Sequence, residues 1–384
     1  MKKIFLLFSL LFVVGNLLAQ VQNKAIVTAV PFLQVSADAR ASGMGDMGVA
    51  TSADVYSQQW NAAKYPFAEN KMGIGLSYTP YMSSLSNDTG LLNLNFFNKI
   101  NERSAFAFSL RYFGIGETLF KQNEDDAGQI MKPNEFAFDG SYSLKLSEKF
   151  AMSVTGRYIR SNLEIQQADS DAHAAGSFAV DIAGFYQTPE TAFKNFNGIW
   201  RAGFNVSNLG PKLKYNGDAG SENFLPANLK VGGGFDFIFD QDNTLGTSIE
   251  FNKLLVPSPQ NNQTNAEYQN AGFVKGAFNS FTDAPDGFSE ELKEVTWALG
   301  LEYLYQKAFA LRTGYFHESS EKGDRKFFTI GAGFKYKMAK FDLSYLSSAS
   351  KQNTALDNTL RFSLSFNIGD NPVNNIEEKE KPTN

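Results

Sequence analysis

The sequence predicts an all-β fold: a transmembrane antiparallel β-barrel of about 14 strands with an N-terminal plug segment. Three observations predict it. Apolar and polar residues alternate in many repeated stretches, the chain begins with a signal peptide, and the connections differ in length between the two ends of the expected sheet. A barrel surrounded by lipid and filled with water needs strands that are apolar on one face and polar on the other.

The alternation extends from residue 72 to residue 368, and Gly, Asn, Asp and Ser are frequent in the turns between repeats. The last repeat is the clearest, because every second residue from Leu360 to Ile368 is apolar and polar residues such as Arg361 lie between them. The predicted strands are 72–78, 91–97, 104–113, 135–145, 151–163, 177–186, 200–207, 228–238, 244–254, 295–303, 309–316, 326–336, 340–346 and 359–368. A soluble β-sandwich would alternate too, so this pattern alone does not place the chain in a membrane.

Residues 1–19 are typical of a secretory signal peptide, with Lys2 and Lys3 before an apolar stretch and Leu18-Ala19 at the expected cleavage site. No other run reaches the roughly 20 apolar residues that a spanning helix needs. If the mature chain is in a membrane, it therefore spans it as strands, and only a closed barrel satisfies all their backbone groups in lipid. The absence of cysteine excludes disulfides and thiolate metal sites, and a net charge of −5 provides no basic surface for nucleic acid. We expect no cofactor.

The lengths of the connections indicate the orientation of the barrel. With the N-terminus in the periplasm, the periplasmic turns are short, at 99–103, 146–149, 239–243, 304–308 and 337–339, and only 187–198 is longer. The opposite end has the long loops 121–134, 164–176, 210–227, 256–294 and 347–358. This sorting is typical of outer-membrane barrels with external loops. The expected organisation is a signal peptide (1–19), a plug (20–70), the barrel (71–368) and a polar periplasmic tail (369–384).

Charged residues of both signs fall on the polar face of the strands. They are Arg111, Arg157, Arg201, Lys230, Arg312, Arg361, Asp139, Asp181, Asp236, Glu250 and Glu302. We expect these residues to fill and brace the lumen as internal ion pairs. The alternative is that they line a selective path for an ion or solute.

The segment before residue 70 does not alternate. Gly43, Gly45 and Gly48 fit the dinucleotide-binding pattern G-x-G-x-x-G, but that pattern requires a strand before it and a helix after it, and neither is expected here. We therefore interpret these glycines as positions where a plug of small residues packs closely against the inner wall.

Loop 256–294 is longer than a connection requires, and loops of this length tend to be functional or disordered. Its large apolar residues Phe273, Phe278, Phe281 and Phe288 predict a contact site for a partner. A lid that folds over the barrel mouth is the alternative, and the sequence does not decide between them.

Catalytic chemistry is not expected. His173 and His317 occur without an H-E-x-x-H motif, and the chain has no G-x-S-x-G motif. The acidic clusters 124–126, 169–171 and 240–242 lack the ligand spacing of a calcium loop, so we interpret them as solvated turns.

The plug segment also carries a family resemblance. Asp38, Arg40, Gly43, Gly45 and Gly48, followed by Trp60 and Asn61, resemble the N-terminal signature of the PorV family, although Asn61-Ala62-Ala63 stands where that family usually has Asn-Pro-Ala. The resemblance implies a FadL-like barrel of fourteen strands with no enzymatic activity. It also implies an outer-membrane shuttle of the type IX secretion system, which receives cargo by its C-terminal domain from the translocon barrel and delivers it to a sortase-like peptidase.

A FadL-like transporter of hydrophobic small molecules is the alternative function. A transporter needs a continuous apolar passage, whereas the predicted lumen is charged.

Overall fold

The structure is a computed structural model that describes residues 25–81, 89–121, 127–163, 174–215, 222–260, 267–268, 271–350 and 358–370. The predicted signal peptide, the acidic clusters 124–126 and 169–171, His173 and residues 371–384 lie outside this part of the chain.

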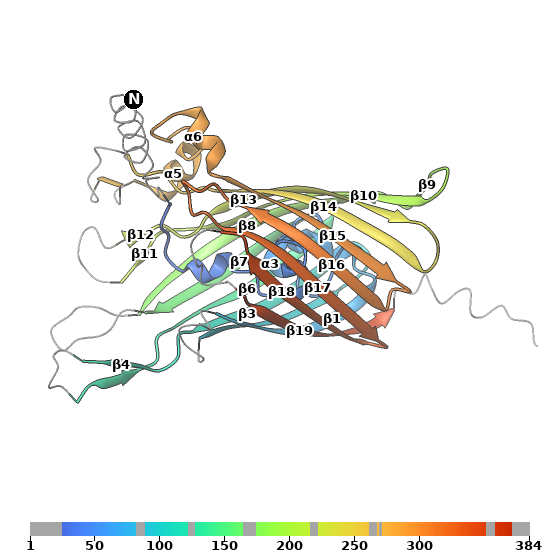
Figure 1. The fold of residues 1–384 in the computed structure, drawn as a ribbon, viewed down its shortest axis with the longest axis horizontal. Coiled ribbons are helices and arrows are strands. Elements are labelled where there is room, and N and C mark those ends of the chain that lie inside the picture. Colours follow the sequence, from blue (N-terminus) through green and yellow to red (C-terminus); the bar gives the residue numbers. More distant parts are fainter. Residues whose placement is uncertain are drawn as a thin grey trace, which may run out of the picture.

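Within the described residues, fourteen antiparallel strands form a closed barrel (Figure 1). They are β1 (Asn70–Pro80), β2 (Gly90–Lys99), β3 (Ser104–Gly114), β6 (Asn134–Lys145), β7 (Phe150–Asn162), β8 (Ala175–Gln187), β10 (Asn197–Leu209), β13 (Asn228–Ile238), β14 (Asn243–Leu254), β15 (Val295–Tyr305), β16 (Phe309–His317), β17 (Lys326–Tyr336), β18 (Ala339–Ser348) and β19 (Leu360–Asp370). The barrel closes where β19 pairs with β1, with Ile368 opposite Met72. The predicted fold class is confirmed, and every predicted strand is present with ends shifted by at most three residues.

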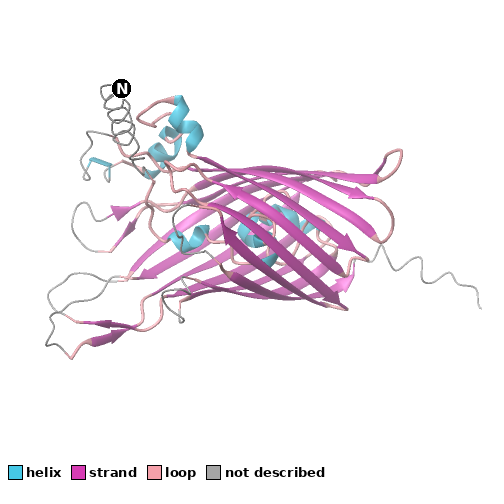
Figure 2. Ribbon diagram, in the orientation of Figure 1, coloured by secondary structure: helices cyan, strands magenta, loops and turns pink. Residues whose placement is uncertain are grey.

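The two ends of the barrel differ, as Figures 1 and 2 show. One end, which we call the long-loop end, carries the hairpin of β4 (Thr118–Phe120) and β5 (Gln129–Met131), the hairpin of β11 (Leu213–Lys214) and β12 (Glu222–Asn223), and helices α5 (Phe273–Asn279) and α6 (Phe288–Lys293). The other end, the short-turn end, has tight turns and the small strand β9 (Thr191–Ala192). No helix in the described residues is long and apolar enough to cross a bilayer.

The two faces of each strand differ as the alternation predicts. On β19, Phe362, Leu364 and Phe366 are exposed on the outer surface, whereas Arg361 and Ser363 are buried on the lumen side. Because side chains alternate along a strand, one register places the apolar residues of β19 outside and its polar residues inside. The outer wall is therefore a surface suited to lipid.

The lumen is filled by residues 29–68, which we call the inner segment and which Figure 1 shows inside the barrel around α3. It consists of η1 (Pro31–Gln34), α2 (Ala39–Ser42), α3 (Ser57–Trp60) and η2 (Ala62–Phe67). Side-chain caps stabilise these short turns: Asp38 accepts a hydrogen bond from the backbone N–H of Ala41 (2.8 Å), and Asn61 accepts one from that of Ala63 (3.0 Å). Asn61 thus caps η2 although alanine follows it instead of proline.

Candidate functional site

Arg40 connects the inner segment to the barrel wall. Its guanidinium donates to both carboxylate oxygens of Glu302 on β15, at 2.9 and 2.8 Å, and to Asp54 at 2.8 Å. Glu302 also accepts from Arg312 on β16 at 2.7 Å, and Arg312 donates to Asp342 on β18 at 2.8 Å. Apart from Asp54, which is partly exposed, these alternating charges are buried, and charge-assisted bonds of this length are the strong ones. The row of ion pairs therefore holds the inner segment against β15, β16 and β18.

Glu250 on β14 is the second attachment point. One of its carboxylate oxygens accepts the backbone N–H groups of Gly48 and Val49, both at 2.8 Å. Asn61 donates to the carbonyl oxygens of Val49 and of Gly184 on β8, both at 2.9 Å. The inner segment is thus bound to β8 and β14 as well as to β15.

Two of the motif glycines lie where the inner segment touches the wall. A Cβ added to Gly43 would lie 3.1 Å from the Cα of Gly331 on β17. A Cβ added to Gly45, whose φ is +82°, would lie 3.0 Å from the carbonyl oxygen of Tyr315 on β16. Gly48 differs, because its Cβ would collide with the ring of Trp60. Gly48 is therefore small to accommodate a neighbour within the inner segment. Trp60 itself donates from Nε1 to Asp38 at 2.8 Å.

The other inward charges pair across neighbouring strands. Arg157 on β7 donates to Asp139 on β6 at 2.6 Å and to Asp181 on β8 at 2.9 Å. The guanidinium of Arg201 on β10 pairs with both carboxylate oxygens of Asp236 on β13. Arg361 on β19 reaches Asp46 of the inner segment at 2.6 Å. Each pair joins two strands, or a strand and the inner segment. Arg111 and Lys230 are paired much more loosely.

The inner segment leaves a cavity on each side. The cavity at the long-loop end has a volume of about 390 Å³ and is lined by residues including Leu33, Trp60, Arg111 and Lys230. The cavity at the short-turn end has a volume of about 1000 Å³, with Arg40 and Lys340 in its lining. Both linings mix charged, polar and apolar groups.

Residues 255–294 carry the aromatic side chains singled out in the sequence. Phe278 on α5 and Phe288 on α6 are 75% and 77% exposed, and Phe273 and Phe281 are also exposed. Leu292, which the sequence did not single out, is exposed beside them on α6. These side chains point to solvent and do not fill the barrel mouth. We call Phe273, Phe278, Phe281, Phe288 and Leu292 the aromatic surface.

A buried ion-pair network fixes α6, which carries Phe288 and Leu292 of the aromatic surface. Lys253 on β14 donates to Glu291 at 3.0 Å and to Glu294 at 2.7 Å. Lys322, in the connection between β16 and β17, donates to Glu290 at 2.6 Å and to Glu294 at 2.9 Å. Burial lowers the pKa of Lys322, but its hydrogen bonds to the two carboxylates outweigh burial and raise that pKa above its usual value. The end of α6 is thereby fixed to the barrel rim.

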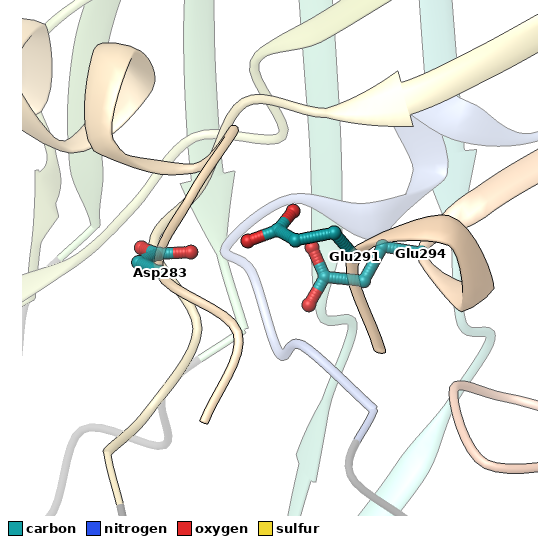
Figure 3. A group of neighbouring side chains, drawn as sticks. All are labelled: Asp283, Glu291 and Glu294. Atoms are coloured by element: carbon teal, nitrogen blue, oxygen red, sulfur yellow. The ribbon is translucent and has the colours of Figure 1, made fainter. Parts of the chain in front are cut away.

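Two carboxylates of this network and the neighbouring Asp283 resemble a metal site. Asp283, Glu291 and Glu294 have oxygens within 4.8 Å of one another (Figure 3). Burial raises the pKa of Asp283 to about 6. However, ammonium groups already occupy the network, because Lys253 contacts both glutamates and Lys322 contacts Glu294. We therefore assign the cluster a structural role. This cluster was not predicted, because the lysines that neutralise it, Lys253 and Lys322, come from separate segments of the chain.

Two further residues that were weighed as candidates for catalysis or calcium binding, His317 and Asp240, have structural roles. The ring of His317, the last residue of β16, stacks on Trp297 with 5.1 Å between centroids. Asp240 accepts the backbone N–H groups of Asp242 and Asn243, both at 2.8 Å, and so closes the β13–β14 turn.

Solved structures with a similar fold include the TodX monoaromatic hydrocarbon channel deltaS2 mutant (TM-score 0.51, 10% identity, covering 88% of this chain and 100% of that one). The TodX deltaS2S3 mutant channel follows (TM-score 0.50, 10% identity, 86% and 98%). A Pseudomonas aeruginosa FadL homologue is also similar (TM-score 0.46, 12% identity, 87% and 98%). At such low identity the likeness to the two TodX channels shows the fold alone. A comparison with curated protein sequences found no match.

The family comparison extends beyond the fold. The family model described as "Type IX secretion system protein PorV" matches residues 18–261, which is more than half of the chain and includes the whole inner segment. The chain therefore belongs to the PorV family and is an outer-membrane component of the type IX secretion system.

Proposed function

We propose that this protein is a non-catalytic carrier that binds the C-terminal domain of secreted cargo at the type IX translocon barrel. It then delivers the cargo to the sortase-like peptidase of the attachment complex. Membership of the PorV family supports a role in this secretion system. The observation that carries the proposal is the aromatic surface, which lies at the long-loop end on two short helices.

The aromatic surface has the properties of a protein contact site. Large exposed apolar groups in one patch usually mark an interaction site, and aromatic residues dominate the binding energy of interfaces. The ion pairs of Lys253 and Lys322 hold α6 in one position, so little conformational entropy is lost when a partner binds. We place the long-loop end at the cell exterior, because short periplasmic turns and long external loops are the rule for such barrels.

Transport of a hydrophobic small molecule is less well supported. A transporter needs an apolar passage that connects both sides of the membrane. Here the inner segment lies between the two cavities, and its contacts with Glu302 and Glu250 are charged. A carrier that holds its cargo outside the barrel has no need of a passage, so a filled lumen suits this role.

The test is a double substitution, Phe278→Ser with Phe288→Ser. Both side chains are about three-quarters exposed, so the barrel should still fold and show its heat-modifiable mobility in electrophoresis. We expect the amount of cargo that co-purifies from native membranes to fall about tenfold or more, because each aromatic anchor contributes on the order of 1–2 kcal/mol. Quantitative identification of the co-purified proteins measures this effect.

The matched control is Leu119→Ser with Ile130→Ser. These apolar residues lie at the same end of the barrel on the β4–β5 hairpin and are also exposed, at 55% and 63%. The control should retain its cargo. Undiminished cargo in the Phe278/Phe288 variant, or an equal loss in the control, would refute the assignment of the contact to the aromatic surface.

A further inference from the structure

We propose that the cavity at the long-loop end binds a small oxyanion, a carboxylate or phosphate group, between Arg111 and Lys230. Both residues line this cavity of about 390 Å³. The proposal does not rest on the carrier function, because the aromatic surface lies outside the barrel.

Arg111, on β3, has more donors than acceptors around it. It is 2% exposed, and its Nη1 donates to the carbonyl oxygen of Leu33 at 3.2 Å. Its shortest distance to a carboxylate is 3.9 Å, to Asp139, and its Nε has no partner among the described residues. Asp139 is already used, because Arg157 donates to one of its oxygens at 2.6 Å and Ser109 donates to the other at 3.0 Å. A buried guanidinium carries five N–H donors, and unfilled donors are costly.

Lys230, on β13, also lacks a close acceptor for its ammonium group. The nearest carboxylate oxygen to its Nζ belongs to Glu250, at 3.9 Å, and it makes no hydrogen bond to any described residue. The other oxygen of Glu250 is engaged by Gly48 and Val49. The ammonium lies 4.3 Å from the centroid of the Trp60 ring. This contact offers attraction but no hydrogen-bond acceptor.

The carboxylate contacts of Arg111 and Lys230, both at 3.9 Å, are longer than those of other buried arginines. Other inward arginines, such as Arg40 and Arg312, make carboxylate contacts of 2.7–2.9 Å. The positive charges of Arg111 and Lys230 also repel each other. Beside Arg111, the amide of Asn93 on β2 is buried without a partner, and Asn93 lies opposite Arg111 in the β2–β3 register. Arg111 and Lys230 therefore line one cavity without a close carboxylate partner, and the unpartnered amide of Asn93 lies beside Arg111.

An oxyanion fits this arrangement. Carboxylate and phosphate oxygens accept several N–H bonds, and the planar guanidinium binds them in a bidentate manner. The volume is within the range of small-molecule sites. The cavity lining includes Val27, which is 77% exposed, so the cavity opens to solution at the long-loop end. A bound anion would balance the charge of the two cations and supply acceptors for the Nε of Arg111 and for the ammonium of Lys230.

The test is calorimetric titration of the purified full-length barrel in detergent, once with sodium acetate and once with inorganic phosphate, at constant ionic strength. We expect saturable binding of at least one of the two anions. Binding of acetate alone would identify a carboxylate as the ligand group, and binding of phosphate alone would identify a phosphate. Lys230→Gln should weaken that binding about tenfold, and Lys230→Arg, which keeps the charge, should retain it. Lys340→Gln is the control, because Lys340 lines the other cavity.

The proposal would be overturned if neither probe showed saturable binding up to about 10 mM, a limit that corresponds to a binding free energy of less than roughly 3 kcal/mol. Equal binding by wild type and a folded Lys230→Gln variant would overturn it as well.

Discussion

Replacing Gly314 with alanine is expected to displace the inner segment from the lumen. Gly314 lies on β16, and a Cβ there would be 2.2 Å from both the backbone N of Gly45 and the carbonyl carbon of Met44. No side-chain rotation relieves this clash, because backbone atoms are on both sides of it. β16 cannot retreat either, since it is hydrogen-bonded to β15 and β17. Overpacking of this kind costs about 1–3 kcal/mol or more, and the segment can avoid that cost only by moving.

Limited proteolysis and conductance report the displacement of the inner segment. In the Gly314→Ala barrel we expect cleavage within residues 29–68 and ion conductance in a planar bilayer, while wild type shows neither. The matched control is Gly156→Ala on β7, where an added Cβ meets no atom within 4 Å. A Gly314→Ala barrel as protease-resistant and as closed as wild type would contradict the close packing of Gly45 against β16.

The second large effect is expected for Glu302→Gln. Glu302 is shared by Arg40 and Arg312, so a neutral amide leaves two buried guanidinium groups without their common counter-charge. Breaking a buried ion pair by removing one partner costs about 3–5 kcal/mol. We expect the free energy of unfolding in urea, measured in lipid vesicles, to decrease by about this amount.

The matched control is Glu117→Gln. Its pair with Lys132 is just as short, at 2.7 Å, but the two side chains are 57% and 71% exposed. Solvent screens such a pair, so the unfolding curve should not change measurably. If Glu302→Gln unfolded at the same urea concentration as wild type, the ion pairs around Arg40 would not be what holds the inner segment.

Most of the barrel strands were predictable from the sequence, because the apolar–polar alternation that marks a strand appears within a few neighbouring residues. A strand has a side-chain period of two, so a few residues suffice to show its position and its faces. For β13 and β17 both predicted ends are those observed. The short helices α5 and α6 were missed, because 7 and 6 residues are too few to show a helical period.

By itself, the sequence determined the fold class, the strands and the residues that face the lumen. Only the tertiary structure decided which of those residues meet. Arg40 and Glu302 are 262 positions apart, and the network of Lys253, Glu294 and Lys322 joins three separate segments. The physical reason is that alternation is written into neighbouring residues, whereas contact across the lumen depends on how the barrel closes and where the inner segment lies within it.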